Sequence, residues 1–559
     1  MAVTWGDVLA FMDRFLAAVA AIVLAVIVLA LAVYILAYFQ HPDDVTQSWW
    51  TKIVAVLSLF VVFYAPVFAG IDFSSTNEAA CRSSENFTDD VSLFLTGQCA
   101  TPSRVILHLL VYCDILLVYF IIPFTMNFSM DAMQTSFRTR LLRALAIATL
   151  LSGCVAGAYA LLWYFFGFVE LQVDQLESGL IAHPAEGLAL QECIGIVEPE
   201  DIYSSSTGVL GAVQQTVSCD AVSSLSPSAV LSLRIDFGEY IIVLHTLLGA
   251  VLFSVVGGVG LASYPWHLIS GFIHRERRPL TKSEYIRRVQ AISEKARIIR
   301  DKAYDARKEE LNESTEGSRG KLAIRRYRNR LLRRITLLEM EDKALQPLFP
   351  EGEDPAKEWT ITVMKYWGEL FVGIIGAILS VAWLINVVTF VIPDPPISLF
   401  LNRLLALQSN DYWQRLSIIF VVTMLSTHLV LCSVDGLCTI GLSIKTLPVH
   451  PLTLGTTMID SMLMNCLVLL FITPAIMAFQ ASSLALISAN SNTAIMYGFE
   501  YSNMRILRFF SGSYLLLYAM LGFFALTLLL GIRSIIQQCA AARQARQREE
   551  ARQSSLSRY

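Results

Sequence analysis

Nine stretches of mostly apolar residues constrain this chain more than any other feature of its sequence. Each is close to the roughly 20 residues that a helix needs to cross a bilayer. They cover residues 15–39, 53–71, 105–128, 145–169, 240–272, 367–391, 416–440, 458–479 and 510–532. The strict alternation of a membrane β-barrel is absent, so the backbone amides are expected to pair within helices. The sequence therefore predicts an all-α, polytopic membrane protein with about nine transmembrane helices.

Basic residues are concentrated on one side of this predicted topology. Between Arg275 and Arg334 lie 20 of the 42 Lys and Arg residues, and residues 533–559 hold further Arg. Residues 170–236 are acidic, with Arg234 as their base. Because Lys and Arg are enriched in cytosolic loops, the basic segment and the C-terminus are expected in the cytosol. With nine spans, the N-terminus is then outside or lumenal.

The four cysteines of the two large outer loops are expected to form disulfides, because these loops face an oxidising compartment. Pairing within each loop, Cys81 with Cys99 and Cys193 with Cys219, is the simplest arrangement, and cross-loop or free alternatives stay open. Asn86 begins the sequon "NFT" in the first of these loops and is a candidate glycosylation site.

The basic segment between the fifth and sixth spans has the pattern of a helical hairpin. Apolar residues between Val289 and Ala306 recur at alternating spacings of three and four, as in a coiled coil. "NESTEGSRG" then interrupts the helix, and a second basic helix begins at Lys321. Four regions result: a five-span half (1–272), the cytosolic hairpin (273–364), a four-span half (365–533) and an Arg-rich cytosolic tail (534–559). A solvated hairpin and a docking arm for proteins or anionic lipid are both consistent with this pattern.

Ionisable residues within the spans are the candidate ligand or transport residues, because a charge at membrane depth is costly unless it faces the bundle interior. Asp114 in the third span and Asp435 in the seventh are the deepest acids, and His245 lies in the fifth span. Structural hydrogen bonding is the alternative role for each. The chain has no motif of a catalytic, metal or cofactor site, so we expect no enzyme activity, no metal and no cofactor.

The end of the fifth span has an unusual pattern, "GGVGLASYPWHLI". Gly258 and Gly260 are expected to break the helix or to allow close helix approach, and Pro265 and Trp266 to mark its arrival at the cytosolic interface. A dense basic run follows directly. We therefore predict that this motif is the hinge between the five-span half and its cytosolic arm.

This motif, the segment "STHLVLCSVDGLCTIGL" and the order of five spans, hairpin and four spans resemble the limb-region-1-like membrane protein family. That family includes the lipocalin-interacting membrane receptor and the lysosomal cobalamin transport escort protein. One departure is Tyr264, where the family usually has Leu before the Pro. The resemblance implies a protein of the plasma membrane or the endolysosomal membrane that acts in ligand uptake or in support of another transporter.

Three function classes follow, of which a purely structural scaffold for signalling receptors or lipid organisation is the third and weakest. The first is a receptor or escort with membrane lipid around it, a protein partner at the hairpin, and an extracellular carrier protein or a partner transporter. The alternative is a transporter that moves a small, lipophilic or vitamin-like solute through its own helix bundle. Nucleic-acid binding is not expected, because acids are interleaved with the bases of the hairpin and the hairpin is tethered to a membrane.

Overall fold

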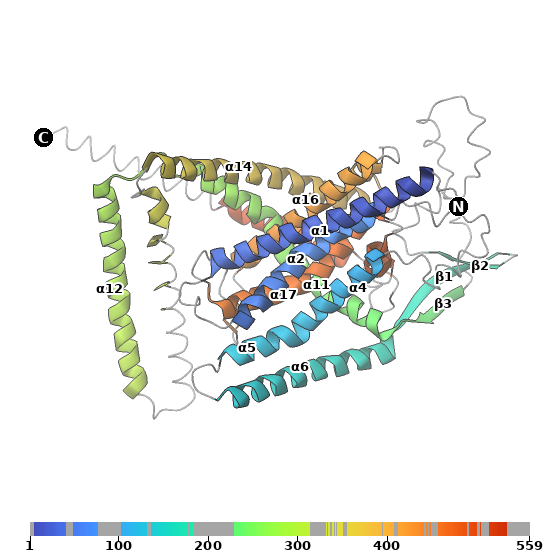
Figure 1. Cartoon of the computed structure of the whole chain (residues 1–559), viewed down its shortest axis with the longest axis horizontal. Helices are drawn as coiled ribbons and strands as arrows, with labels where there is room; N and C mark the ends of the chain where they lie inside the picture. Colours follow the sequence, from blue (N-terminus) through green and yellow to red (C-terminus); the bar gives the residue numbers. More distant parts are fainter. Residues whose placement is uncertain are drawn as a thin grey trace.

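The computed structural model shows a bundle of long helices lying side by side (Figure 1). It describes residues 5–40, 49–75, 102–130, 136–176, 179–183, 229–312, parts of 331–349, 355–393, 395–406, 412–440, 443–444, 447–448, 457–488, 491–499, 504 and 514–533. Among these residues, nine helices are long and apolar enough to cross a membrane. The prediction of an all-α, polytopic membrane protein with about nine spans is thereby confirmed.

The spanning helices, in chain order, are α1 (Trp5–Phe39), α2 (Trp49–Ser75), α4 (Pro102–Leu116) with the π-helical turn η3 (Leu117–Ile121) and α5 (Ile122–Met130), α6 (Phe137–Phe166), α11 (Phe237–Ile273), α14 (Pro355–Asn386) with the π-helical turn η5 (Val387–Val391), α16 (Tyr412–Ile440), α17 (Ile459–Ser483) and Leu515–Arg533. The other elements are β1 (Phe168–Leu176), β2 (Gly179–His183), β3 (Ala229–Arg234), α12 (Lys282–Asn312), η4 (Gln346–Leu348), α15 (Phe400–Ala406), β4 (Ser443–Ile444), β5 (Leu447–Pro448), α18 (Ala485–Ser488) and η6 (Ala494–Phe499).

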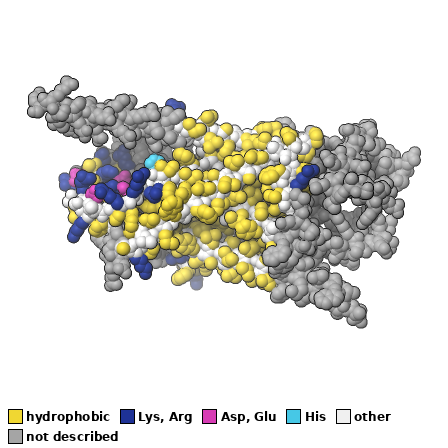
Figure 2. Space-filling view, turned by 90° about the horizontal axis from the view of Figure 1, so that it is seen from above, with side chains coloured by type: hydrophobic (Ala, Val, Ile, Leu, Met, Phe, Trp, Pro, Cys, Tyr) yellow, Lys and Arg dark blue, Asp and Glu magenta, His cyan; other side chains and the backbone are white. Residues whose placement is uncertain are grey.

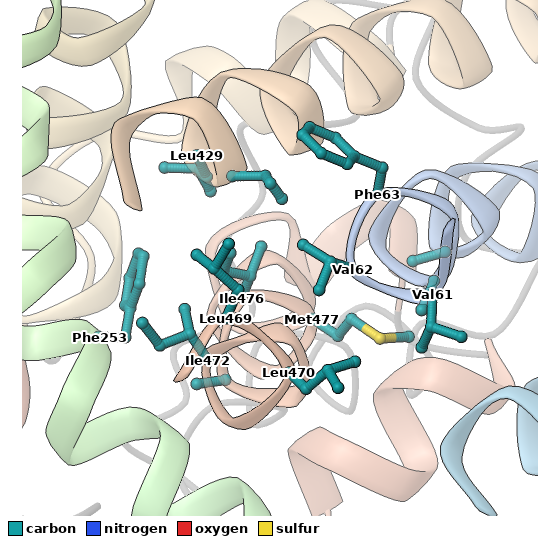
Figure 3. Close-up of a cluster of buried hydrophobic side chains, with 14 of the residues drawn as sticks. Val61, Val62, Phe63, Phe253, Leu429, Leu469, Leu470, Ile472, Ile476 and Met477 are labelled. Carbon is teal, nitrogen blue, oxygen red and sulfur yellow. The ribbon is translucent and has the colours of Figure 1, made fainter. Parts of the chain in front are cut away.

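The core of the bundle is built by α2, α11, α16 and α17. Figure 3 shows Phe63 of α2, Phe253 of α11 and Leu429 of α16 arranged around Leu469 and Ile476 of α17. Polar links run through the same core: the side-chain amide of Gln480 donates to the hydroxyl of Ser426, 2.8 Å away, and Ser426 donates to the carbonyl of Pro66. Apolar packing therefore joins all four helices, and these hydrogen bonds link α17, α16 and α2.

The peripheral spans carry much more exposed apolar surface. Only 11% of the most apolar window of α6 is buried within the molecule, and 17% of that of α1, against 78% for α2. Seen from above, the molecule has a broad band of apolar side chains across its middle (Figure 2). Because lipid tails solvate apolar side chains as well as a protein core does, these faces suit the hydrocarbon region of a bilayer.

A three-stranded antiparallel sheet lies at one end of the bundle, with the strand order β2–β1–β3 (Figure 1). Its register pairs Phe168 with Arg234, and Gln172 with His183. The indole N–H of Trp163, near the end of α6, donates to the carbonyl of Ile235 at 2.9 Å and thus anchors the sheet to the bundle. The sequence analysis missed this sheet, although "FVELQVDQL" has the alternating pattern of a half-buried strand.

The basic helix α12 lies at the opposite end and crosses the direction of the bundle (Figure 1). Figure 2 shows Lys and Arg side chains gathered at this end. Figure 1 also places the beginning of α1 at the sheet end. The structure thus separates the start of α1 from the basic arm by the length of the bundle, as the five spans between them require.

The two membrane halves predicted from the sequence share one hydrophobic core. Residues of α2 and α11, from the first half, belong to the same buried cluster as residues of α16 and α17, from the second. The chain leaves this bundle at the end of α11, Ile273, and re-enters it with α14, which begins at Pro355.

Candidate functional site

Helix α11 carries the residues that the sequence analysis singled out in the fifth span. It begins at Asp236, whose carboxylate accepts a hydrogen bond from the backbone N–H of Gly238 at 3.0 Å and so caps the helix. It then continues to Ile273. The expected interruption at Gly258 and Gly260 is not found, and Pro265 lies buried within the same helix. Packing on several sides holds the backbone where proline removes one hydrogen bond.

The glycines of the motif allow close helix packing instead. A Cβ atom at Gly260 would overlap the carbonyl group of Cys432 on α16, and one at Gly436 would overlap the carbonyl group of Val256. A Cβ at Gly258 would lie 2.6 Å from the carbonyl oxygen of Met520 in the last span. The glycines therefore bring backbone against backbone, as small residues do in membrane bundles. Trp266, in contrast, is 39% exposed near the end of α11.

Asp114 and His245 lie together, and we call them the buried Asp–His pair. Asp114 is on α4 and His245 on α11, and both are buried. Oδ2 of Asp114 is 3.4 Å from Nε2 of His245. Neither Oδ1 of Asp114 nor Nε2 of His245 makes a hydrogen bond. Each is therefore a buried polar atom whose hydrogen-bonding capacity is unused.

Two tyrosines extend this pair. Nδ1 of His245 is 3.0 Å from the hydroxyl of Tyr119, which is 2.6 Å from the hydroxyl of Tyr159 on α6. Tyr119 lies in the π-helical turn η3, which interrupts the third span directly after Asp114. The ring of Phe471 on α17 stacks on His245 with the centroids 4.9 Å apart. Single π-helical turns often occur at functional sites.

Asp435 is part of a second cluster, which we call the half-exposed Asp–His pair. Its carboxylate lies 2.9 Å from Nδ1 of His267 on α11 and accepts a hydrogen bond from the hydroxyl of Ser263. The side chain of His267 is 53% exposed. A carboxylate with two hydrogen-bonding partners is well satisfied, which favours a structural role here.

The structure does not bring Asp114 and Asp435 together. Their histidine partners are 22 residues apart on the unbroken helix α11, which corresponds to about 33 Å along its axis. The layer between them includes the rings of Phe253, Phe479 and Trp383. The two pairs are therefore separate sites near opposite ends of α11.

Other buried polar residues were not singled out by the sequence analysis. Asp72 at the end of α2 accepts hydrogen bonds from the backbone N–H and the hydroxyl of Thr493, both at 2.8 Å, and from the side chain of Asn492. His428 on α16 is 2.8 Å from the hydroxyl of Ser380 on α14. His428 could have been selected from the sequence, because it is a polar residue within an apolar span. Asp72 could not, because it follows the predicted second span directly and is indistinguishable from the polar loop beyond it.

Part of the predicted outer-loop chemistry lies outside the described residues. This applies to Asn86 and to the four cysteines expected in disulfides, which are Cys81, Cys99, Cys193 and Cys219. Cys113, Cys154, Cys432 and Cys466 within the spans are free thiols. The part of the chain that the structure describes contains no group of three or more His, Cys, Asp or Glu residues arranged to hold a metal ion.

The arm formed by α12 is anchored at its base. The backbone N–H of Leu280 donates to the carbonyl of Leu348 at 2.9 Å, and the ring of Tyr285 stacks on Phe349. Leu280, Leu345 and Leu348 form a small buried cluster against which Trp359 of α14 packs. The arm therefore has an apolar base of its own, fixed to the sixth span.

A capping box begins α12. The hydroxyl and backbone N–H of Thr281 donate to the carboxylate of Glu284, and the N–H of Glu284 faces the Thr281 hydroxyl. These hydrogen bonds, first from the backbone and then from the side chain of Thr281, lower the pKa of Glu284. The start of the arm is thus set by local chemistry.

The bundle of spans, its buried polar pairs and its basic arm define a polytopic helical membrane protein. The model of the family described as LMBR1-like membrane protein matches residues 17–339. A LIMR family protein of Arabidopsis thaliana is 28% identical over 493 residues, which cover 88% of this chain and 90% of the relative. A LIMR family protein of rice, Oryza sativa subsp. japonica, is 28% identical over 497 residues, with the same coverage.

A LIMR family protein of Dictyostelium discoideum is 24% identical over 519 residues, covering 88% of this chain and 92% of the relative. No solved structure matches the chain. The matched segment spans more than half of the sequence, from the first span into the arm. The chain belongs to the LMBR1-like membrane protein family, as its sequence resemblance indicated.

Proposed function

We propose that this protein is a membrane receptor or transporter escort whose basic arm binds an acidic segment of a cytosolic partner and thereby couples the bundle to trafficking. The observation that carries the proposal is the anchored arm itself. Helix α12 has 31 residues, so it is about 46 Å long. Its apolar base packs on the sixth span, while most of its basic side chains face solvent.

The ion pairs of the arm leave it available for a partner. Arg288 pairs with Glu276, and Lys295 with Glu341, at 2.9 and 2.8 Å, and all four side chains are at least 41% exposed. Exposed pairs of this kind contribute about 0–1 kcal/mol each. An acidic partner can therefore replace them at little cost, because the base of the arm is held by other contacts.

A pocket beside α12 gives such a partner a place to insert an apolar side chain. It has a volume of about 350 Å³ and lies between α12 and residues 341–348. Ile292, Leu345 and Leu348 contribute apolar surface, and Arg288 and Lys295 contribute positive charge. Glu341 also lines the pocket and pairs with Lys295 through an exposed contact that an acidic partner can replace. This combination fits an acidic peptide with an apolar anchor residue.

The basic end of the molecule also supports the expected topology, with the arm in the cytosol and the sheet outside or in a lumen. We place the protein in the plasma membrane or the endolysosomal membrane, on the family resemblance. An extracellular carrier protein or a partner transporter would then contact the sheet end or the lipid-facing spans. No enzyme activity is part of the proposal. The transporter alternative has less support, because the histidine partners of its two acidic candidates lie about 33 Å apart along α11.

The test is a mild-detergent pull-down of the tagged full-length protein from its own cells, with mass spectrometry of the bound proteins and small molecules. The matched variant replaces residues 282–342 with a short Gly/Ser linker and keeps Leu345 and Leu348 at the base. We expect a stoichiometric partner with the wild type, and loss of that partner and of normal localisation with the variant. Unchanged partner recovery and localisation in the variant would refute the docking role.

A second control separates charge from fold. Arg297→Gln and Arg300→Gln remove exposed positive charges from α12 with little effect on helix propensity, and Ser293→Ala is a neutral change on the same helix. The proposal requires weaker partner recovery with the two Arg variants. Partner recovery with Ser293→Ala should equal that of the wild type. A protein recovered alone with a lipophilic molecule would favour the transporter alternative, and flux in Asp114→Asn and Asp435→Asn variants would test it.

A further inference from the structure

We infer that the buried Asp–His pair, Asp114 and His245, is a proton-binding site inside the membrane bundle, which takes up one proton per chain. The inference is independent of the docking arm, since it rests on residues of the third, fourth and fifth spans. Its ligand is the proton itself, delivered from water. The geometry that points to it is a carboxylate and an imidazole, both buried, with atoms left unpaired on each.

Each side chain of the buried Asp–His pair has a polar atom without a hydrogen-bond partner. Both side chains of the pair are almost fully inaccessible, with 4% of Asp114 and 1% of His245 exposed. Oδ1 of Asp114 and Nε2 of His245 make no hydrogen bond, although Oδ2 and Nε2 are 3.4 Å apart. Buried polar atoms are nearly always satisfied, so an unsatisfied pair in contact requires an explanation. A proton shared by the two groups supplies one.

The net charge of the buried pair also favours uptake of a proton. With an ionised Asp114 and a neutral His245 the pair has one net negative charge, and no Lys or Arg pairs with it in the part of the chain that the structure describes. Burial of an uncompensated charge is costly, and a group in that position takes up a proton or a partner. One added proton makes the pair neutral overall. The uptake therefore removes the net charge without moving a helix.

The tyrosines can accommodate both states of the pair. Before uptake, the imidazole proton is on Nδ1 and donates to the hydroxyl of Tyr119, which donates to the hydroxyl of Tyr159. The unprotonated Nε2 then faces Oδ2 of the ionised carboxylate. After uptake the added proton lies between Nε2 and Oδ2. The tyrosines keep the same hydrogen bonds in both states, because a hydroxyl can be donor and acceptor at once.

The surroundings of the pair contain further titratable groups but no competing charge. Cys113 neighbours it on α4, Tyr119 on η3 and Tyr159 on α6. Tyr240 on α11 lies close to Tyr159, and its buried hydroxyl makes no hydrogen bond. From α17 the pair meets the apolar ring of Phe471. Thiols and phenols are neutral near pH 7, so the proton is expected to bind to the pair.

The test measures proton uptake by the full-length protein in nanodiscs as the pH falls from about 9 to about 5, the range in which His titrates. The wild type is compared with the double variant Asp114→Asn/His245→Gln. We expect the double variant to bind about one proton fewer per chain, because it removes both groups that share the proton. The control double variant Asp435→Asn/His267→Gln alters the half-exposed pair. When Asp114→Asn/His245→Gln is added to this control, proton uptake must fall by the same amount as when it is added to the wild type.

Infrared difference spectra over the same pH range provide a second readout. The signals of the pair should be lost in Asp114→Asn alone, a nearly isosteric change that tests the site should the double variant fail to fold. Equal uptake and equal spectra in wild type and variants would overturn the inference. So would an uptake that depends on the NaCl concentration at constant pH, because the occupant would then be a metal cation.

Discussion

The crossing of α11 and α16 makes the sharpest prediction about stability, through Gly260→Ala. A Cβ at this position would overlap the carbonyl group of Cys432, which belongs to the backbone of α16 and has no rotamer to change. An extra methyl group in a packed core costs about 1–3 kcal/mol. Because the obstacle here is a backbone, we expect about 3 kcal/mol, the upper end of that range.

Gly157→Ala is the matched control. Gly157 lies on the exposed face of α6, and a Cβ there would meet no atom within 4 Å. Replacing a glycine in a helix interior by alanine stabilises the helix by about 0.5–1 kcal/mol. The two Gly→Ala variants should therefore shift the free energy of unfolding in opposite directions.

Thiol labelling measures the effect at the crossing itself. Cys432 is a free, fully buried thiol, so its labelling by a maleimide reports opening of the α11–α16 contact. A loss of about 3 kcal/mol should raise its labelling rate about a hundredfold. Cys466, buried on α17, is the internal reference for global unfolding. If Cys432 is labelled at the same rate in the Gly260→Ala variant as in the wild type, the backbone-contact argument is refuted.

Three further predictions concern the ends of the bundle. Trp163→Phe removes the hydrogen bond to the carbonyl of Ile235, and we expect a loss of about 1 kcal/mol in the free energy of unfolding by denaturant. Asp72→Asn weakens the contacts with Thr493; a loss of about 2 kcal/mol should appear in the same assay. The pKa of Glu284 is lowered from 4.5 by its hydrogen bonds with the cap residue, so the cap is stabilising above that value and is lost as the pH falls through the lowered pKa. The protection factors of the backbone amides in the first turn of α12, which are corrected for the pH dependence of intrinsic exchange, should therefore fall in acid in the wild type, and Glu284→Gln should abolish that fall.

Several properties of the chain followed from the sequence because they depend on local pattern. The spans and their helical state were predicted from hydropathy, since a bilayer forces any long apolar segment into a helix. The basic arm was predicted from its charge and its heptad spacing. Val289 and Ile292, two residues of this heptad pattern, pack against the cluster of Leu280, Leu345 and Leu348 at the base of the arm. Asp114 and His245 could be selected as candidates because ionisable residues are rare at membrane depth.

The arrangement of the spans was beyond the reach of the sequence. Helix α6 has a mean hydropathy of 2.0 and α2 one of 2.4, yet 11% of the first window and 78% of the second are buried. Lipid and protein solvate an apolar side chain almost equally well, so hydropathy does not tell a central helix from a peripheral one. The structure also decided between the two roles considered for Gly260, which is a contact point and not a break in the helix.

The partners of the polar residues were likewise decided by tertiary structure. Asp114 meets His245, and Asp435 meets His267, across sequence separations of more than 100 residues. The sequence marked these side chains as costly to bury and so determined that each would need a partner. Only the packing of α4 and α16 against the unbroken helix α11 decided which partner each acid found, because hydrogen bonds depend on distances of a few ångströms that no local pattern encodes.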